Sequence, residues 1–359
     1  MMNNHLTSFY IEKFRRFKRL EIKQFGQINL ITGQNNIGKS CLLEAVWLYG
    51  TAGDPHVIQE ILRNRGELRT NDISAINRFL HNQTDMLSNS WDSAIKISQS
   101  EDSSDDEFVI KLDFANNQSA PIADAYRIDY EKTSGEKPLV FLQNSPILVI
   151  KQHLAEDRII NHTFQQIYPN KLPSTHKYQF VPSKGITFEK IVDLWDTIDL
   201  TSLQDDVIHA LQIIDPNVRG IGLDVREQLP NIRIGNKRWL LSSLGEGMNR
   251  IFELALALVN AKDGFLMIDE IENGLFYENQ HTVWGFIFEV AKRLNVQVFV
   301  TTHGKDTIEA FDYANRKHED VEGILISLRQ IRNKPGEVVG ITFDTEDIEY
   351  LVDSNTEVR

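Results

Sequence analysis

Short apolar runs alternate with helical patterns in the last third of the chain. The expected strands are 264–268, 296–301, 323–328 and 337–341, and the expected helices are 246–259, 281–294 and 306–314. Strands that alternate with helices are typical of a mostly parallel sheet covered by helices on both faces. This region therefore predicts an α/β core.

The first fifty residues contain three strand patterns, at 8–11, 20–22 and 27–32, and then a helix pattern at 41–50. The third strand runs directly into Gly33, and a glycine- and asparagine-rich segment separates it from the helix. A strand, a glycine loop and a helix in this order form a phosphate-binding loop. We expect this strand to join the sheet of the last third.

The middle of the chain has a mixed pattern. Its expected helices are 55–64, 72–80, 188–195 and 203–214, and its expected strands, taken as antiparallel, are 94–97, 108–114, 126–130 and 147–150, with a meander at 218–226, 232–234 and 239–241. We expect a core made of residues 1–50 and 238–359, with 51–237 as an inserted or second lobe. The predicted fold is a P-loop α/β fold with a mixed sheet, an antiparallel lobe and an inserted helical segment.

Composition narrows the class of protein. The 359 residues carry a formal net charge of −13 and contain one cysteine, Cys41, so no intrachain disulfide can form. No apolar run is long enough to span a bilayer and no signal-peptide pattern is present, so we expect a cytoplasmic protein without a membrane partner. The net acidity argues against a surface that binds nucleic acid everywhere.

Basic residues nevertheless crowd the N-terminus. They are Lys13, Arg15, Arg16, Lys18, Arg19 and Lys23. Such charges form either the solvated face of a strand or a local groove for nucleic acid.

The glycine loop predicts the nucleotide site. Its expected nucleotide-binding residues are Gly33, Asn35, Asn36, Gly38, Lys39, Ser40 and Cys41. Glycines allow close approach of the backbone, and the N–H groups of the loop and of the following helix face phosphate oxygens. Lys39 would neutralise the β- and γ-phosphates, and Ser40 would bind Mg²⁺.

Two carboxylates end the strand at 264–268. In an open α/β sheet, ligands bind at the carboxyl ends of strands. Asp269 is therefore expected to bind Mg²⁺ through water, and Glu270 to polarise the attacking water. Glu272 follows closely. It could help to bind the metal or only solvate the loop, and we favour the second.

Two further segments could reach a nucleotide. Ser243 is expected to be the N-cap of the next helix, with Glu246 completing a capping box. Such a helix end, with Gly245 beside it, would bind anions such as the γ-phosphate of a nucleotide on another subunit. His303 ends the strand that follows the Asp269 strand, where it could sense the γ-phosphate.

Together these segments resemble the ATP-binding-cassette heads of the chromosome-maintenance and DNA-repair class. The similarity is strongest to small heads of the RecF and OLD type and, within that class, to the AAA-type ATP-binding family of prokaryotic defence loci. The motifs that carry it are 11–17, 33–40, 241–250, 268–275 and 301–303. They cover both ends of the chain, whereas the middle is similar only in its length and in its general mixture of helix and strand patterns.

The resemblance implies an arrangement in which two subunits enclose two ATP molecules. The segment Ser243 to Glu246 of one subunit would face the phosphate loop of the other, and Gly274-Leu275 would signal between the two sites. A glutamine of the first lobe normally senses Mg²⁺, and Gln143 is one candidate. Three residues depart from the family pattern, namely Leu244 in place of glycine, Phe276 in place of histidine and Gly304 in place of serine.

The leading hypothesis is an ATPase that associates on ATP and regulates a separately encoded effector, such as a nuclease, in anti-phage defence. It rests on the resemblance and on the lack of a nuclease pattern, since residues 323–359 are too few for a Toprim domain. The alternative is a RecF-like DNA-repair ATPase that binds DNA itself. A third possibility is a nucleotide-gated scaffold with negligible hydrolysis, against which the intact Glu270 argues.

Overall fold

The computed structural model describes most of both ends of the chain and parts of the middle. The described residues are 5–51, 55–67, 95–99, 108–114, 126–131, 139–142, 147–152, 177–224, 228–334 and 336–354. Among them, no helix combines the length and the apolar character needed to cross a bilayer. The expected helix at 72–80 lies outside the described residues.

The centre of the structure is a parallel group of strands. β3 (Ile28–Gly33) pairs in parallel with β14 (Gln297–Thr301) on one side and with β15 (Gly323–Gln330) on the other. β13 (Gly264–Ile268) pairs in parallel with β14 and with β9 (Lys177–Val181), the edge strand. The phosphate-loop strand thus joins the sheet of the last third, as expected, although more than 200 residues separate them in sequence.

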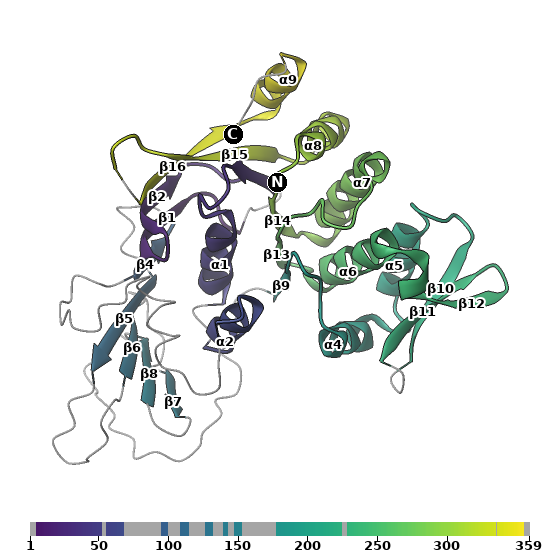
Figure 1. Cartoon of the computed structure of the whole chain (residues 1–359), viewed down its shortest axis with the longest axis horizontal. Coiled ribbons are helices and arrows are strands. Elements are labelled where there is room, and N and C mark those ends of the chain that lie inside the picture. The colour runs from purple at the N-terminus through teal and green to yellow at the C-terminus, as the bar shows by residue number, and fades with distance from the viewer. Residues whose placement is uncertain are drawn as a thin grey trace.

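The sheet continues past β15 into mixed pairings. β16 (Glu337–Phe343) is antiparallel to β15 and parallel to β2 (Phe17–Ile22), which is antiparallel to β1 (Phe9–Phe14). The remaining strands, at the lower left of Figure 1, are β4 (Ile95–Ser98), β5 (Phe108–Phe114), β6 (Tyr126–Glu131), β8 (Ile147–Gln152) and β7 (Leu139–Leu142). The expectation of antiparallel strands was wrong for one pair, because β7 is placed at the edge and β8 lies parallel to β6.

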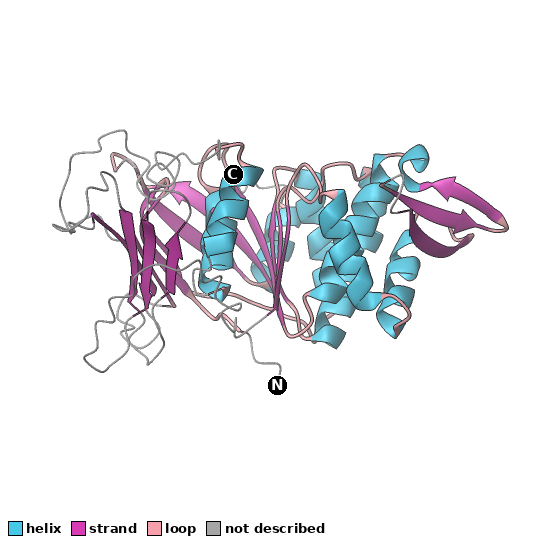
Figure 2. Ribbon diagram, turned by 90° about the horizontal axis from the view of Figure 1, so that it is seen from below, coloured by secondary structure: helices cyan, strands magenta, loops and turns pink. Residues whose placement is uncertain are grey.

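Helices cover both faces of the central strands (Figure 2). On one face lie α1 (Lys39–Gly50) and α2 (Pro55–Asn64). The other face is covered by α4 (Phe188–Ile198), α5 (Ser202–Leu211), α6 (Glu246–Asn260), α7 (Tyr277–Leu294), α8 (Lys305–Lys317) and α9 (Thr345–Asp353). Successive strand residues alternate between the two cores: Phe265 and Met267 pack toward α1, whereas Leu266 and Ile268 pack toward α6 and α7.

A separate antiparallel sheet lies beyond α5 (Figure 1). It consists of β10 (Val218–Asp224), β11 (Leu229–Ile234) and β12 (Lys237–Leu240). Buried Val218 and Ile232 join this sheet to the core around α6. β12 leads directly into a 3-10 turn, η2 (Leu241–Leu244), and then into α6.

The observed architecture confirms the predicted mixed α/β fold. The division into 1–50, 51–237 and 238–359 stays a prediction. β9 lies within the range assigned to the second lobe, yet it is hydrogen-bonded along β13.

Candidate functional site

The phosphate loop connects β3 to α1, and two glycines shape it. Gly33 has a φ of 144° and Gly38 a φ of 114°, a region that favours glycine. A Cβ on Gly33 would lie 2.7 Å from the Leu328 carbonyl oxygen, and one on Gly38 would lie 2.6 Å from the Phe17 ring. No side chain caps α1, and the first N–H groups of a helix point toward the residues before it, which here are the loop. Asn35 and Asn36 are exposed on the loop.

Lys39 is nearly buried at the start of α1. Its Nζ donates to the Gly33 carbonyl oxygen at 2.8 Å and to the Gln34 carbonyl oxygen at 3.2 Å. The same Nζ lies 3.3 Å from Nδ1 of His303. The ammonium group therefore lies inside the loop, between its backbone and the end of β14.

Asp269 follows β13 and meets two hydroxyl groups. Ser40 Oγ donates to Asp269 Oδ1 at 3.0 Å, and Thr301 Oγ1 donates to the same oxygen at 2.7 Å. Burial raises the pKa of Asp269, an effect that the hydrogen bonds from Thr301 and Ser40 oppose. A buried carboxylate beside a serine hydroxyl is an oxygen donor set that suits Mg²⁺. Thr301 was not assigned a role from the sequence.

Glu270 lies in a left-handed turn, with a φ of 50°. Its Oε1 is 3.1 Å from Nε2 of His303, and its Oε2 accepts a hydrogen bond from Asn273 Nδ2 at 2.8 Å. Its backbone N–H donates to Thr301 Oγ1 at 2.8 Å. A non-glycine residue with positive φ persists only where its surroundings fix it, and here both its side chain and its backbone are bound.

Glu272 does more than solvate the loop, contrary to expectation. Its Oε1 accepts hydrogen bonds from the backbone N–H of His303 at 2.6 Å and of Gly304 at 3.1 Å. The carboxylate therefore fixes the backbone of the segment that carries the His303 ring. Only the position of Glu272, three residues after Asp269, could have signalled this role.

The capping box expected at Ser243 and Glu246 was wrong. Ser243 lies in η2, and its Oγ donates to the Leu240 carbonyl oxygen at 2.7 Å. Gly245, with a φ of 96°, is the N-cap of α6, and no side chain caps this helix. Ser243 lies before the N-cap position, and its hydroxyl is bound within the 3-10 turn, so it does not cap α6. The end of α6 is thereby left exposed.

The segment from Ser243 to Glu246, called the signature segment below, is separate from the phosphate loop of its own chain. Ser243, Gly245 and Glu246 are exposed. Within the described chain, no hydrogen bond or ion pair joins them to 33–40 or to 269–270. After the turn at Gly274, Phe276 and Tyr277 are 57% and 56% exposed, and their ring centroids lie 4.7 Å apart.

Two other residues were expected at the site, namely Cys41 for nucleotide binding and Gln143 for Mg²⁺. Cys41 is buried, and its Sγ lies 3.4 Å from a guanidinium nitrogen of Arg65, so only its backbone is near the loop. Burial raises the pKa of its thiol. Gln143 lies outside the described residues.

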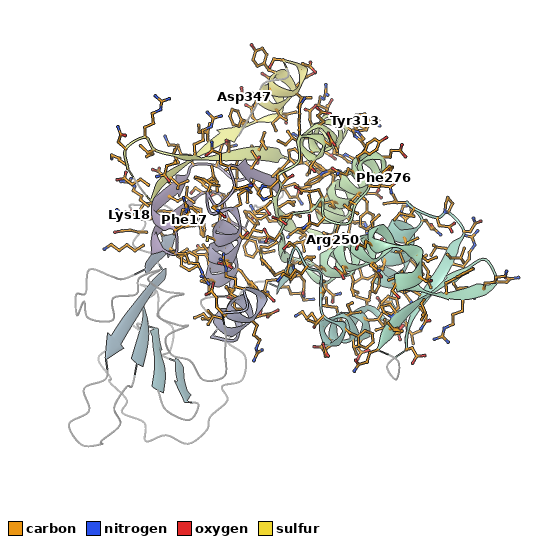
Figure 3. All side chains as sticks on the ribbon, viewed as in Figure 1. Phe17, Lys18, Arg250, Phe276, Tyr313 and Asp347 are labelled. Carbon is orange, nitrogen blue, oxygen red and sulfur yellow. The ribbon has the colours of Figure 1, made fainter. Side chains whose placement is uncertain are left out.

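Arg15 is packed against the back of α1. Its Nε lies 3.3 Å from Glu44 Oε2, and its Nη1 lies 3.2 Å from Glu67 Oε1. Arg16, Lys18 and Arg19 are exposed, and Figure 3 labels Lys18 next to Phe17 on β2. Most of the basic N-terminal residues thus form the solvated side of β1 and β2, while Arg15 is part of the packing.

The fold and this arrangement define a P-loop ATPase head. The chain belongs to the RecF/RecN/SMC N terminal domain family, which matches residues 5–321. A Helicobacter pylori protein named ATP/GTP phosphatase is 22% identical over 97% of this chain and 98% of its own length. An Smc head solved bound to the C-winged helix domain of ScpA has a similar fold, with a TM-score of 0.53 and 14% identity over 97% of this chain and 100% of that one.

Proposed function

We propose that this chain binds ATP with Mg²⁺ and hydrolyses it, at a site that a second copy of the chain completes. The observation that carries the proposal is the meeting of Ser40, Asp269, Glu270 and His303 at the ends of neighbouring strands. The name of the Helicobacter pylori relative supports hydrolysis over binding alone.

Each residue has a task that follows from its place. Ser40 and Asp269 would bind Mg²⁺, which neutralises phosphate charge as the bond to the γ-phosphate breaks. Lys39 would bind the β- and γ-phosphates from within the loop. Glu270 would accept a proton from the attacking water, and His303, 3.1 Å from Glu270 Oε1, would orient that carboxylate and contact the γ-phosphate.

The exposed signature segment supports completion by a second copy. Gly245 leaves the N–H groups of α6 without a side-chain cap, and such a helix end favours an anion. Among the described residues, no hydrogen bond or ion pair joins this helix end to the phosphate loop of its own chain, so the anion would be a nucleotide phosphate held by a second copy. The exposed Phe276 and Tyr277 follow the turn at Gly274, which packs on the first turn of α6, and they offer apolar surface for association.

Variants at two positions test hydrolysis. Lys39→Ala should lose ATP binding, because the phosphates lose their buried cation. Glu270→Gln should still bind ATP but hydrolyse it on the order of 100-fold more slowly, and it should accumulate as an ATP-bound dimer in sedimentation velocity runs. Turnover of Glu270→Gln at the wild-type rate would show that Glu270 is not the base.

The output of the cycle is proposed to be regulation of a separately encoded effector, such as a nuclease in prokaryotic anti-phage defence. The similar Smc head was solved with a domain of another protein bound, which supports a partner protein. Affinity isolation with the co-expressed products of neighbouring genes, with and without ATP, tests this. Lys39→Ala is the matched control, and a set of partners that ATP does not change would contradict the proposal.

Direct DNA binding through the basic N-terminus has less support. The guanidinium of Arg15 contacts Glu44 and Glu67 and is therefore committed to packing. The test is a salt titration of DNA binding with Arg16→Glu, a residue that is exposed. A steep salt dependence that this change weakens would favour the DNA-binding alternative.

A further inference from the structure

Arg250 is a buried arginine on α6 that the proposed chemistry does not use. It is 5% exposed, and Figure 3 labels it beside α6. One terminal nitrogen donates to the Pro182 carbonyl oxygen at 2.9 Å. The other donates to the carbonyl oxygens of Asp269 at 3.0 Å and of Glu270 at 3.2 Å. Its guanidinium therefore joins the chain after β9 to the turn after β13.

The carbonyl oxygens that Arg250 binds indicate which part of the site this side chain positions. Asp269 and Glu270 are the residues proposed to bind Mg²⁺ and to activate water, and Arg250 contacts their backbone rather than their carboxylates. Glu270 has a φ of 50°, an uncommon conformation for a residue with a side chain, which contacts such as this one stabilise. A planar guanidinium with fixed N–H directions can bind several carbonyl groups at once, which a lysine cannot do.

Nearby carboxylates compensate for the burial of the Arg250 charge. Burial lowers the pKa of Arg250, and Glu253, Asp269, Glu272 and Glu270 oppose that effect, Glu253 most strongly. Its Nη1 lies 3.9 Å from Glu253 Oε2 on the same helix. The guanidinium stays charged in this setting, since arginine is not deprotonated in proteins.

The same helix begins at the exposed signature segment. Arg250 lies one turn after Glu246, and both pack against Gly274, where an added Cβ would lie 3.6 Å from the Cβ of each. A Cβ on Gly247 would lie 3.2 Å from the Gly274 carbonyl oxygen. The lack of a side chain at Gly247 thus allows α6 to lie directly on the turn that follows Glu270, so a shift of the helix end reaches that turn.

We propose that Arg250 is a positioning residue that couples the signature end of α6 to the Glu270 turn of the same chain. A nucleotide phosphate of a second subunit at the start of α6 then fixes the helix, and Arg250 fixes the backbone from which Glu270 reaches its water. Occupancy of one site thereby sets the geometry of the other. This inference rests on the proposed function and names a device by which it is regulated.

The test is a double-mutant cycle of Arg250→Met with Glu270→Gln, in the full chain. Arg250→Met should lower kcat on the order of 100-fold, because loss of positioning by about 1 Å has that effect, and should leave KM for ATP within about threefold. In the Glu270→Gln background, the same change should alter the residual rate by less than about threefold, since Arg250 acts through Glu270.

Two further variants separate positioning from folding. Arg250→Lys should retain the charge and the melting temperature but not the wild-type kcat, because one ammonium cannot replace the guanidinium contacts. Arg293→Met is the matched control. Arg293 lies at the end of α7, 2.7 Å from Asp206 and near the amino ends of the strands, whereas the site lies at their carboxyl ends, so this variant should keep full activity.

The outcomes distinguish the inference from the proposed function. Equal losses of kcat in both backgrounds, or wild-type activity of Arg250→Lys, would overturn the coupling role. So would a joint fall of ATP affinity and melting temperature in both Arg250 variants, which would assign Arg250 to structure alone. Wild-type protein without ATP hydrolysis, or Glu270→Gln without effect, would instead refute the proposed function.

Discussion

Thr301→Val tests how the catalytic strand ends are fixed. Thr301 is fully buried at the end of β14. Its hydroxyl donates to Asp269 Oδ1 at 2.7 Å and accepts from the Glu270 backbone N–H at 2.8 Å. Valine has nearly the same shape, so the substitution removes both hydrogen bonds without opening a cavity.

The expected loss of stability follows from the two bonds. A hydrogen bond to a charged acceptor contributes roughly 1.5–3 kcal/mol, and an N–H group left without its partner costs roughly 1–3 kcal/mol. The Glu270 N–H is only partly buried, so its share lies at the low end. We expect the free energy of unfolding to fall by roughly 3 kcal/mol, while kcat falls because the Glu270 turn loses one of its fixed points.

Urea unfolding and steady-state ATP hydrolysis measure the two effects. Thr301→Ser is the matched control, because it keeps the hydroxyl and loses only a methyl group, at about 1 kcal/mol. The ranking Ser above Val should hold for both kcat and unfolding free energy. If Val equals Ser in unfolding free energy, the hydroxyl does not stabilise the strand ends and the reasoning fails.

The remaining predictions concern three other residues. Glu272→Gln should reduce kcat more than it reduces ATP affinity in equilibrium binding, because a neutral amide binds the two N–H groups of the His303 segment less strongly; equal effects on both would contradict this. Ser243→Arg should block ATP-induced association in sedimentation without blocking ATP binding to the monomer; normal association would place the interface elsewhere. The raised pKa of buried Asp269 means that its stability contribution is present below its ordinary pKa and is lost as pH rises through its folded pKa. Asp269→Asn, without nucleotide or Mg²⁺, should therefore flatten the decline of unfolding free energy with rising pH, and a parallel pH curve would refute the assignment.

Parts of the site that depend on one strand or loop could be predicted from the sequence. Gly33 ends a buried strand, and Lys39 and Ser40 begin a helix. The two glycines and the Lys-Ser pair, in this order, predict the phosphate loop. Asp269 and His303 end two apolar runs. Because neighbouring parallel strands end at one edge of the sheet, their meeting near Ser40 follows from the pattern.

Other elements could not be predicted because no local sequence pattern marks them. β9 is an edge strand whose residues are mostly half-buried, so it has no continuous apolar run, although it pairs along the whole of β13. The capping box at Ser243 failed for a different reason. The motif was present, but a 3-10 turn took up the serine hydroxyl and Gly245 became the N-cap.

Thr301, Glu272 and Arg250 share a feature that explains why sequence motifs miss them. Each binds backbone groups of the segments that carry Glu270 or His303. A backbone N–H or C=O is the same for every residue type, so no pattern of side chains marks its partner. The positions of Glu270 and His303 nevertheless depend on these contacts. An L-residue such as Glu270 holds a left-handed backbone conformation only where its surroundings stabilise it. Substitutions at the three supporting residues should therefore affect kcat before ATP affinity, whereas Lys39, which contacts the nucleotide itself in the proposed mechanism, should affect binding first.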